Sequence, residues 1–195
     1  PPKGDFDVYI GIDRGALRLL ENGFALDWAV GDFDSISSDE LAKLKSSGAI
    51  IHQSPAEKDD TDTELALKLL FKAYPLAQAT IFGAFGGRID HFLSNVFLPS
   101  DPELQPFMSQ IHLANETNVI SYFPAGEHTF RAHPEMDYLA FMTDEETELT
   151  ILGAKYELTA ANYFKKKIYA SNEAVGKPIS LTVPSGYVIV IESKD

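Results

Sequence analysis

Cysteine is absent from this sequence of 195 residues. Its absence excludes disulfide scaffolds, thiolate nucleophiles and zinc sites built on thiolates. Long apolar runs are missing as well, because no stretch approaches the roughly 20 apolar residues that a membrane-spanning helix needs, and we expect no signal leader. These absences predict a protein that has no membrane partner and works in the cytoplasm, where disulfides are rare.

Basic residues are scarce, since 16 Lys and Arg stand against 29 Asp and Glu and leave a formal net charge of -13. Binding to nucleic acid depends on Lys and Arg side chains that neutralise phosphates, so we expect no nucleic-acid partner. The one basic cluster, residues 165–167, is typical of a solvated loop or strand edge. An acidic protein that holds a polyphosphate needs a metal ion between the two.

The first half of the chain alternates apolar strand patterns with helical patterns. The expected strands are residues 7–12, 28–30, 49–52 and 79–82. Ser37 with Glu40, and Thr61 with Glu64, have the spacing of capping boxes that open two of the helices. Strands that alternate with helices predict a parallel, Rossmann-like sheet with right-handed crossovers.

The second half changes character near residue 100, where short β-branched or aromatic segments separated by turn residues begin. The sequence Pro184-Ser185-Gly186 between two of these segments is a hairpin signal. We therefore predict an α/β plus all-β fold, with an α/β domain at residues 1–117 and a β-sandwich domain at residues 118–195. The first expected strand follows the first residue almost at once, so we expect that residues are missing from the front.

Polar clusters follow the expected strands of the first half: Asp13, residues 31–35, residues 58–62 and residues 83–91. In an open parallel sheet the carboxyl ends of the strands share one edge, so we expect these clusters to converge on one crevice. Carboxylates within a few ångströms of one another repel unless some are protonated or a cation lies among them. A hard divalent ion with phosphate ligands satisfies that condition.

Each acidic cluster also has a simpler interpretation, and both stay open. The spacing of Asp32 and Asp34 suits one shared metal ion in an extended segment, and it equally suits an Asx turn ahead of the next helix. Acidic residues at 59–62 suit metal binding, but they also favour any helix N-terminus. His91 suits a general acid or base, or a helix residue near the loop. The other histidines lack metal-ligand spacing: His52, His112, His128 and His133.

Two observations favour phosphate binding when the clusters are taken together. Lys58 and Arg88 supply cations that suit phosphate oxygens. The glycines at 83, 86 and 87 permit positive φ and close approach, so backbone N–H groups can hold an anion where the next helix begins. The sequence G-x-x-x-x-G-K-[ST] is absent, and a P-loop NTPase is therefore a poor fit.

Four motifs, in this order, closely resemble thiamine pyrophosphokinase of the bacterial type: Gly-Ile-Asp-Arg-Gly-Ala at 11–16, Gly-Asp-Phe-Asp-Ser at 31–35, Lys-Asp-Asp-Thr-Asp at 58–62 and Gly-Gly-Arg-Ile-Asp-His at 86–91. A later stretch, Ser-Asn-Glu-Ala-Val-Gly-Lys-Pro at 171–178, resembles the segment of that family's β-rich domain that contacts thiamine. The resemblance covers nearly the whole chain, and the ordered combination is highly specific.

The resemblance implies transfer of a pyrophosphoryl group from ATP to the hydroxyethyl oxygen of thiamine, with Mg²⁺, giving thiamine diphosphate and AMP. By this likeness the metal and catalytic residues are Asp32, Asp34, Asp59 and Asp62, with Arg88 as a further catalytic residue. The ATP-binding residues are Asp13, Arg14, Lys58, Gly86, Gly87 and Arg88. The thiamine-binding residues are Asp90, His91, Ser171 and Asn172. The likeness also implies a homodimer, with each site formed across the subunit interface.

Two other classes of function stay open on the residues alone. The acidic cluster also suits another Mg²⁺-dependent phosphotransferase or phosphohydrolase, or a non-catalytic module that binds a metal or a partner protein.

The family normally has an earlier strand with a glycine-bearing turn before Gly11, which this sequence lacks, so part of the nucleotide contacts is unassigned. The one tryptophan, Trp28, lies in an expected strand, so an aromatic residue on thiamine would be a Phe or Tyr that the sequence does not identify.

Overall fold

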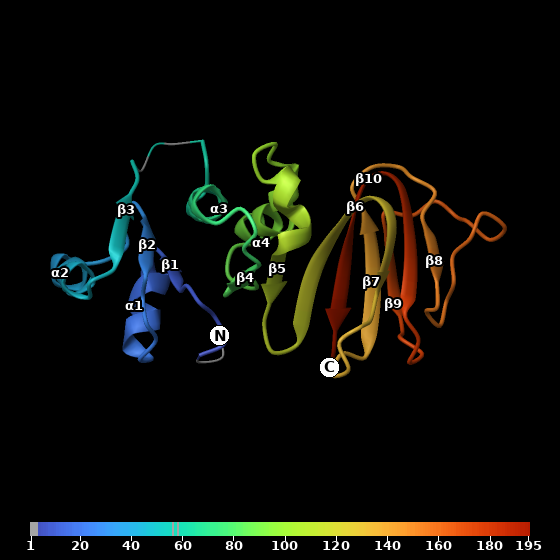
Figure 1. Ribbon diagram of the computed structural model, residues 1–195, viewed down its shortest axis with the longest axis horizontal. Helices are drawn as coiled ribbons and strands as arrows, with labels where there is room; N and C mark the ends of the chain where they lie inside the picture. The colour runs from blue at the N-terminus through green and yellow to red at the C-terminus, as the bar shows by residue number, and fades with distance from the viewer. Residues whose placement is uncertain (1–3, 56, 58) are drawn as a thin grey trace. The chain divides into compact units, whose positions relative to one another are not determined.

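The computed structural model describes residues 4–55, 57 and 59–195. The chain forms two compact units, Pro1–Pro75 and Leu76–Asp195, and each is described by itself. Helices alternate with strands in the first unit, whereas strands predominate in the second (Figure 1). No helix in the described part of the chain has the length and hydropathy to cross a membrane.

The first unit contains a parallel sheet of three strands in the order β1-β2-β3. The strands are β1 (Ile10–Ile12), β2 (Trp28–Gly31) and β3 (Ile50–Gln53), and the helices are α1 (Arg14–Glu21), α2 (Ser38–Ser46) and α3 (Asp62–Ala73). Both predicted capping boxes are confirmed, because Ser37 and Glu40 open α2 while Thr61 and Glu64 open α3. Each box satisfies backbone N–H groups that the first turn of a helix leaves without a partner.

The core of the first unit forms where α1 packs on β1 and β2. Ala16 and Leu17 of α1 are buried beside Ala29 of β2. A Cβ atom at Gly11 would lie 2.3 Å from the Cα atom of Ala16. Only glycine therefore allows the helix to approach the first strand this closely, and the close approach fixes where the residues after β1 lie.

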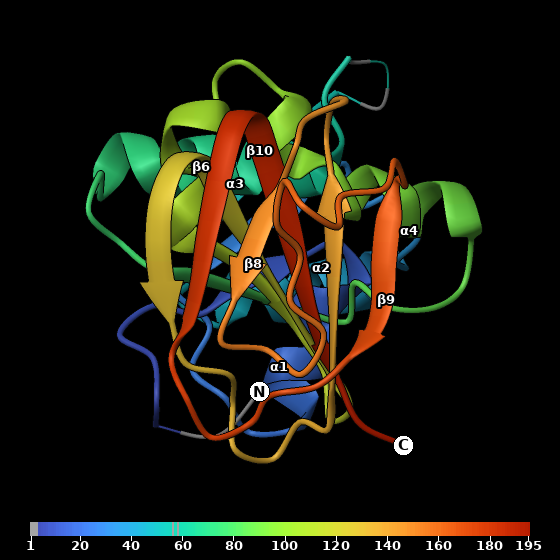
Figure 2. The same ribbon diagram turned by 90° about the vertical axis from the view of Figure 1, so that its right-hand side faces the viewer.

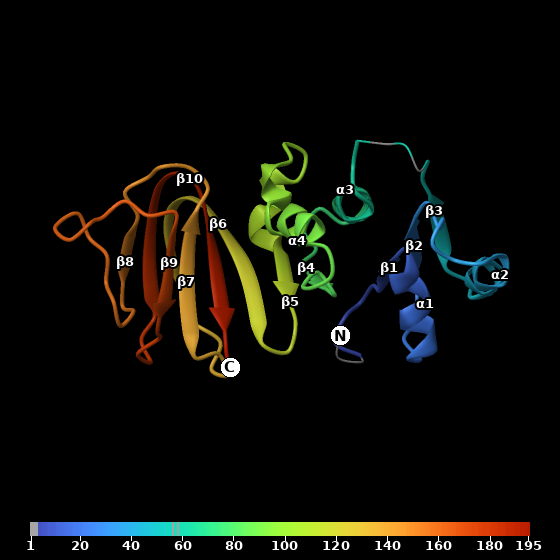
Figure 3. The same ribbon diagram turned by 180° about the vertical axis from the view of Figure 1, so that it is seen from behind.

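The second unit contains a seven-stranded sheet in the order β4-β5-β6-β10-β7-β9, with β8 paired to β10. Its elements are β4 (Ala79–Phe82), α4 (Ile89–Val96), the 3-10 helices η1 (Leu98–Ser100) and η2 (Gln105–Gln110), β5 (Ile111–Ala114), β6 (Asn118–Phe130), β7 (Tyr138–Thr143), β8 (Thr150–Leu152), β9 (Ile168–Asn172) and β10 (Ile179–Ser193). Only β4 and β5 pair in parallel, and α4 belongs to the connection between them (Figure 3).

Strands β6 and β10 bend and take part in both layers of a sandwich (Figure 2). They pair along their whole length, with a register shift between Val183 and Tyr187. One half of β10 also pairs with β7, and the other half pairs with β8. Apolar side chains from both halves, such as Leu181 and Val190, join one buried core between the layers. The predicted α/β plus β-sandwich fold class is confirmed.

Two details of the predicted fold are wrong. Residues 184–186 do not form a hairpin, because β10 runs through them and both of its halves stay paired with β6. The strand at residues 79–82 does not extend the sheet of β1 to β3, because β4 pairs with β5 instead. Short apolar runs of this kind do not specify a partner, so the pairing depends on β5, a later strand that begins at Ile111. The functional division at residues 117 and 118 stays a prediction.

Candidate active site

The carboxyl edge of the first sheet is formed by the residues that follow β1, β2 and β3. Asp13 follows β1, and its backbone N–H donates to the Val30 carbonyl oxygen at 2.9 Å. At the end of β2, Gly31 has a φ of 150°. A Cβ atom at this position would lie 2.0 Å from Oδ1 of Asp13. The Asp13 carboxylate therefore lies directly against the end of β2, and this arrangement requires glycine there.

The turn after β2 is anchored by a buried aromatic ring. Phe33 has a φ of 60° and is 4% exposed, with its side chain in the core of the first unit. The backbone N–H of Asp34 donates to Oδ1 of Asp32 at 2.9 Å, so the Asx turn is present. Asp32 is half-buried and Asp34 is exposed. The turn engages one oxygen of Asp32 and leaves the carboxylate of Asp34 on the outside.

The third carboxylate at this edge comes from the start of α3. The backbone N–H of Ser54, just after β3, donates to the Gly31 carbonyl oxygen at 3.0 Å. The Ser54 hydroxyl donates to Oδ1 of Asp62 at 3.2 Å. Asp60 instead forms an ion pair of 2.9 Å with Lys68 on α3. The structure thus joins Asp62 to the same strand edge and directs Asp60 to the helix.

Asp13, Asp32 and Asp62 accordingly share one edge, whereas Asp59 is exposed and Lys58 lies outside the described residues. Among the residues that the structure describes, no three His, Asp or Glu side chains are grouped closely enough to hold a metal ion. Mg²⁺ usually binds one or two carboxylates and takes its remaining ligands from water and substrate phosphates. The hard oxygen donors at this edge fit such an ion together with a polyphosphate.

Arg14, predicted to bind ATP, stabilises the turn after β2. Its Nη2 donates to the Ser35 carbonyl oxygen at 2.8 Å and lies 3.9 Å from Oε2 of Glu40. Both partners follow the Asp32 turn in the sequence. The guanidinium therefore connects the start of α1 to the turn, and it retains further N–H donors because a guanidinium carries five.

The glycine-rich loop of the second unit has the predicted backbone. Gly83, Gly86 and Gly87 have φ values of 82°, 125° and 68°, and the space where their Cβ atoms would lie is open. Helix α4 begins directly after the loop, at Ile89. Exposed N–H groups at a helix start are suited to anions, so this loop has the backbone that a phosphate needs.

Arg88 and Asp90 form an ion pair at the start of α4. Nε of Arg88 donates to Oδ1 of Asp90 at 3.1 Å, and Nη2 donates to Oδ2 at 2.5 Å. These hydrogen bonds are the largest cause of a lowered pKa for Asp90. Both side chains are mostly exposed, at 71% and 63%, and His91 beside them is exposed too. A phosphate at Arg88 would therefore share the guanidinium with Asp90 or displace it.

The end of β9 carries the other two residues predicted to bind thiamine. Ser171 is exposed and has a φ of 61°. Asn172 is 5% exposed, and its side chain holds the backbone of Tyr156: Oδ1 accepts from the N–H at 2.9 Å and Nδ2 donates to the carbonyl at 2.8 Å. The amide of Asn172 is thus engaged within the protein, whereas Ser171 faces solvent.

Tyr156 is a candidate residue that the sequence did not reveal. Its side chain is 59% exposed although its backbone is fixed by Asn172. The Nζ atom of Lys155 lies 5.5 Å from the centre of its ring and also forms an ion pair of 2.6 Å with Glu173. The available signal was an aromatic residue three positions after Gly153, since glycine is typical of loops and turns. An exposed aromatic ring on a backbone that is held in place provides a flat surface for a planar ligand.

The fold and the site together define a class of protein. A parallel sheet with carboxylates at its edge, followed in the chain by a glycine loop and a β-sandwich, is suited to binding a metal-bound polyphosphate and a second small molecule. The sequence matches the family profile described as thiamin pyrophosphokinase, catalytic domain, over residues 4–105. It matches the profile described as thiamin pyrophosphokinase, vitamin B1 binding domain, over residues 127–188. The chain belongs to the thiamin pyrophosphokinase family.

Individual relatives agree with this assignment. Thiamine pyrophosphokinase of Bacillus subtilis is 34% identical over 192 residues, which are 96% of this chain and 88% of the relative. A crystal structure of a thiamin pyrophosphokinase family protein from Enterococcus faecalis has a TM-score of 0.92 at 41% identity, covering 97% of this chain and 90% of the other. Thiamin pyrophosphokinase from Candida albicans, at 17% identity and a TM-score of 0.77, covering 97% of this chain and 82% of the other, shares the fold.

Proposed function

We propose that this protein transfers a pyrophosphoryl group from ATP to the hydroxyl of thiamine, giving thiamine diphosphate and AMP. The observation that carries the proposal is that one chain matches both the catalytic and the vitamin B1 binding profiles of the family. The contacts of Asp13 and Asp62 at the carboxyl edge of the first sheet support it. Phosphoryl transfer depends mainly on positioning and on neutralising charge, so the protein need not form a covalent intermediate.

In this proposal Asp32 and Asp62 would hold Mg²⁺ at the edge of the first sheet. Asp34 and Asp59 would add further carboxylates beside the ion when ATP is bound. The ion, when bound, would neutralise negative charge on the phosphates. Asp13 shapes the same edge through its contact with the end of β2. Its contact with Gly31 keeps the carboxylate close to the turn that carries Asp32.

The second unit carries further residues that the resemblance assigns to ATP. Backbone N–H groups at Gly86 and Gly87 would donate hydrogen bonds to phosphate oxygens, because the positive φ values of these glycines leave that side of the loop open. Arg88 and Lys58 would add cations, and Arg14 would add its remaining donors. Asp90 would then be released from Arg88, or share it, and would lie with His91 beside thiamine.

Thiamine recognition would use the end of β9 and the loop that packs on it. Ser171 offers a hydroxyl, and Tyr156 offers an exposed ring on which a flat heterocycle can stack. Asn172 would act by positioning, because both ends of its amide hold the backbone of Tyr156. The family resemblance further supports a homodimer in which each site draws on both subunits. The absence of cysteine favours the cytoplasm, and the net charge of -13 argues against a nucleic-acid partner.

The test is incubation of the purified protein with ATP, Mg²⁺ and thiamine, followed by mass spectrometry of the products. AMP and thiamine diphosphate in equal amounts support the proposal. Formation of ADP, or of free phosphate without thiamine diphosphate, would support the rival phosphotransferase or phosphohydrolase. Binding of metal without any turnover of ATP would support the non-catalytic module.

A further inference from the structure

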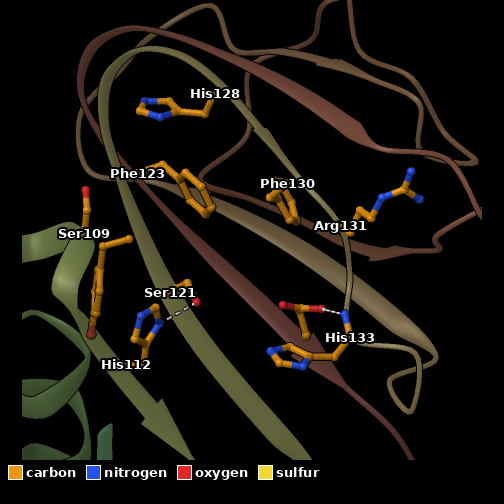
Figure 4. A pocket seen from close by; sticks show the side chains of 10 residues that line it. Ser109, His112, Ser121, Phe123, His128, Phe130, Arg131 and His133 are labelled. Atoms are coloured by element: carbon orange, nitrogen blue, oxygen red, sulfur yellow. Dashed lines mark hydrogen bonds between the residues drawn. The ribbon is translucent and has the colours of Figure 1, made fainter. Parts of the chain in front are cut away.

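A pocket of about 300 Å³ opens between the two layers of the sandwich, within the second unit (Figure 4). His112 and Ser121 form one side of it, and Phe123 with Phe130 forms an aromatic wall. The segment at 131–133 closes another side. A volume of this size is at the lower end of the range for small-molecule sites, which usually combine apolar walls with a few polar groups.

Glu192 of β10 supplies the polar group that makes this pocket unusual. Its side chain lines the pocket although the residue is only 4% exposed. Oε2 accepts the backbone N–H of His133 at 2.6 Å, the bond drawn at His133 in Figure 4. Within the described residues, no cation forms an ion pair with this carboxylate and no group donates to Oε1. Buried carboxylates are normally paired or fully hydrogen-bonded, so one acceptor position is left for a group from outside.

Two of the neighbouring side chains, His112 and Arg131, do not supply that donor as a cation. Burial lowers the pKa of His112, and the nearby His133 lowers it further, so His112 is neutral near pH 7. Its Nδ1 lies 3.0 Å from the hydroxyl oxygen of Ser121. Arg131 lines the pocket, but its guanidinium points away from Phe123 and His112 (Figure 4). Neither His112 nor Arg131 therefore occupies the carboxylate of Glu192, which lines the pocket where an incoming ligand would lie.

The aromatic wall restricts the shape of such a ligand. The rings of Phe123 and Phe130 have centroids 5.0 Å apart, and the ring of His128 lies 5.3 Å from Phe123. Aromatic faces attract cations and planar rings, and an acidic acceptor beside them favours an N–H donor that carries positive charge.

We propose that this pocket binds a small planar organic cation, such as an amidine or a protonated amino-heterocycle, through Glu192 and the aromatic rings of Phe123 and Phe130. This site belongs to the β5, β6 and β10 part of the sandwich and uses none of the residues assigned to ATP or thiamine. The proposal therefore does not depend on the proposed function.

The test measures binding of benzamidine to the full chain by isothermal titration calorimetry, with thiamine absent and with thiamine in excess. Wild-type protein should bind benzamidine at one site under both conditions. Glu192→Gln keeps the shape and the acceptor for His133 but removes the charge, and it should weaken binding by about tenfold or more, because charge-assisted hydrogen bonds are much the stronger kind. Phe130→Leu keeps an apolar wall and should also weaken binding.

The matched control is Glu148→Gln, which removes a charge from an exposed position of the same unit and should leave the affinity unchanged. Circular dichroism must show that all variants are folded, and a crystal soaked in benzamidine should show the ligand between the layers. The proposal is overturned if wild-type protein does not bind benzamidine, if Glu192→Gln binds it as tightly, or if excess thiamine abolishes binding. A pocket that holds only water gives the first of these results.

Discussion

Replacement of Gly31 by alanine tests whether the position of Asp13 matters for activity. The new Cβ atom would lie 2.0 Å from Oδ1 of Asp13, whereas ordinary contact begins at 3.4 Å, so the carboxylate must move by about 1.4 Å. A displacement of about 1 Å in an active site can lower the rate about 100-fold. We therefore expect kcat/KM for ATP to fall by about two orders of magnitude.

Stability also changes, because Gly31 has a φ of 150° that side chains rarely adopt. Backbone strain of this kind costs about 1–3 kcal/mol of the free energy of unfolding. The two effects are separated by Gly48→Ala, since Gly48 has a φ of 87° but open space where its Cβ would lie. This control should lose a similar amount of stability, measured by urea unfolding, and keep its activity.

The assay is the rate of AMP formation with thiamine and Mg²⁺ present, at a temperature where circular dichroism shows both variants to be folded. Loss of activity in Gly31→Ala, with activity retained in Gly48→Ala, supports the assigned place of Asp13. If the folded Gly31→Ala enzyme turns over ATP at the wild-type rate, then the Asp13 carboxylate does not contribute to the site.

Three further experiments test the other parts of the site. Asp62→Asn should lower kcat by at least about 100-fold, as loss of a key electrostatic group does. Asp60→Asn, which alters the ion pair with Lys68 on α3, should keep kcat within a few-fold of wild type. Equal losses of kcat in the two variants would refute the distinction. Arg88→Gln should raise the pKa of Asp90, because the hydrogen bonds from Arg88 keep that pKa low. In the wild type the ion pair should be lost only as the pH falls through this lowered pKa. NMR titration measures the pKa of Asp90, and an unchanged value in the variant would contradict the prediction. Tyr156→Ala should raise the KM for thiamine about tenfold or more, since an aromatic pair contributes about 1 kcal/mol beyond the burial of its surface. Tyr156→Phe keeps the ring and should keep the KM near wild type. If steady-state kinetics show the same KM for both variants, stacking on this ring is excluded.

Local signals in the sequence predicted the first unit well. The capping box at Ser37 depends on a residue three positions away, so its spacing alone is sufficient to place the start of a helix. The contact between Asp13 and Gly31 could not be predicted in the same way. It depends on the φ of Gly31 and on the pairing of β1 with β2, and the neighbouring residues in the sequence determine neither of these.

Signals that depend on distant partners were harder to interpret. Residues 184–186 carry turn chemistry, but the pairing of both halves of β10 with β6 outweighs it and produces a bend. Tyr156 was missed because its backbone is fixed by Asn172, a residue far along the chain. Asp13 and Asp32 could be expected at the carboxyl edge from the sequence, because each comes directly after an expected strand, which is a local rule.

The two long strands of the sandwich, β6 and β10, have a consequence for how this unit responds to change. Because each strand passes from one layer into the other, neither layer keeps a full set of backbone partners without its neighbour. The layers therefore cannot open separately as independent cooperative segments. A destabilising substitution near Leu152 in β8 should therefore also lower the protection of the backbone amides of β7 against hydrogen exchange, because β10 pairs with both strands.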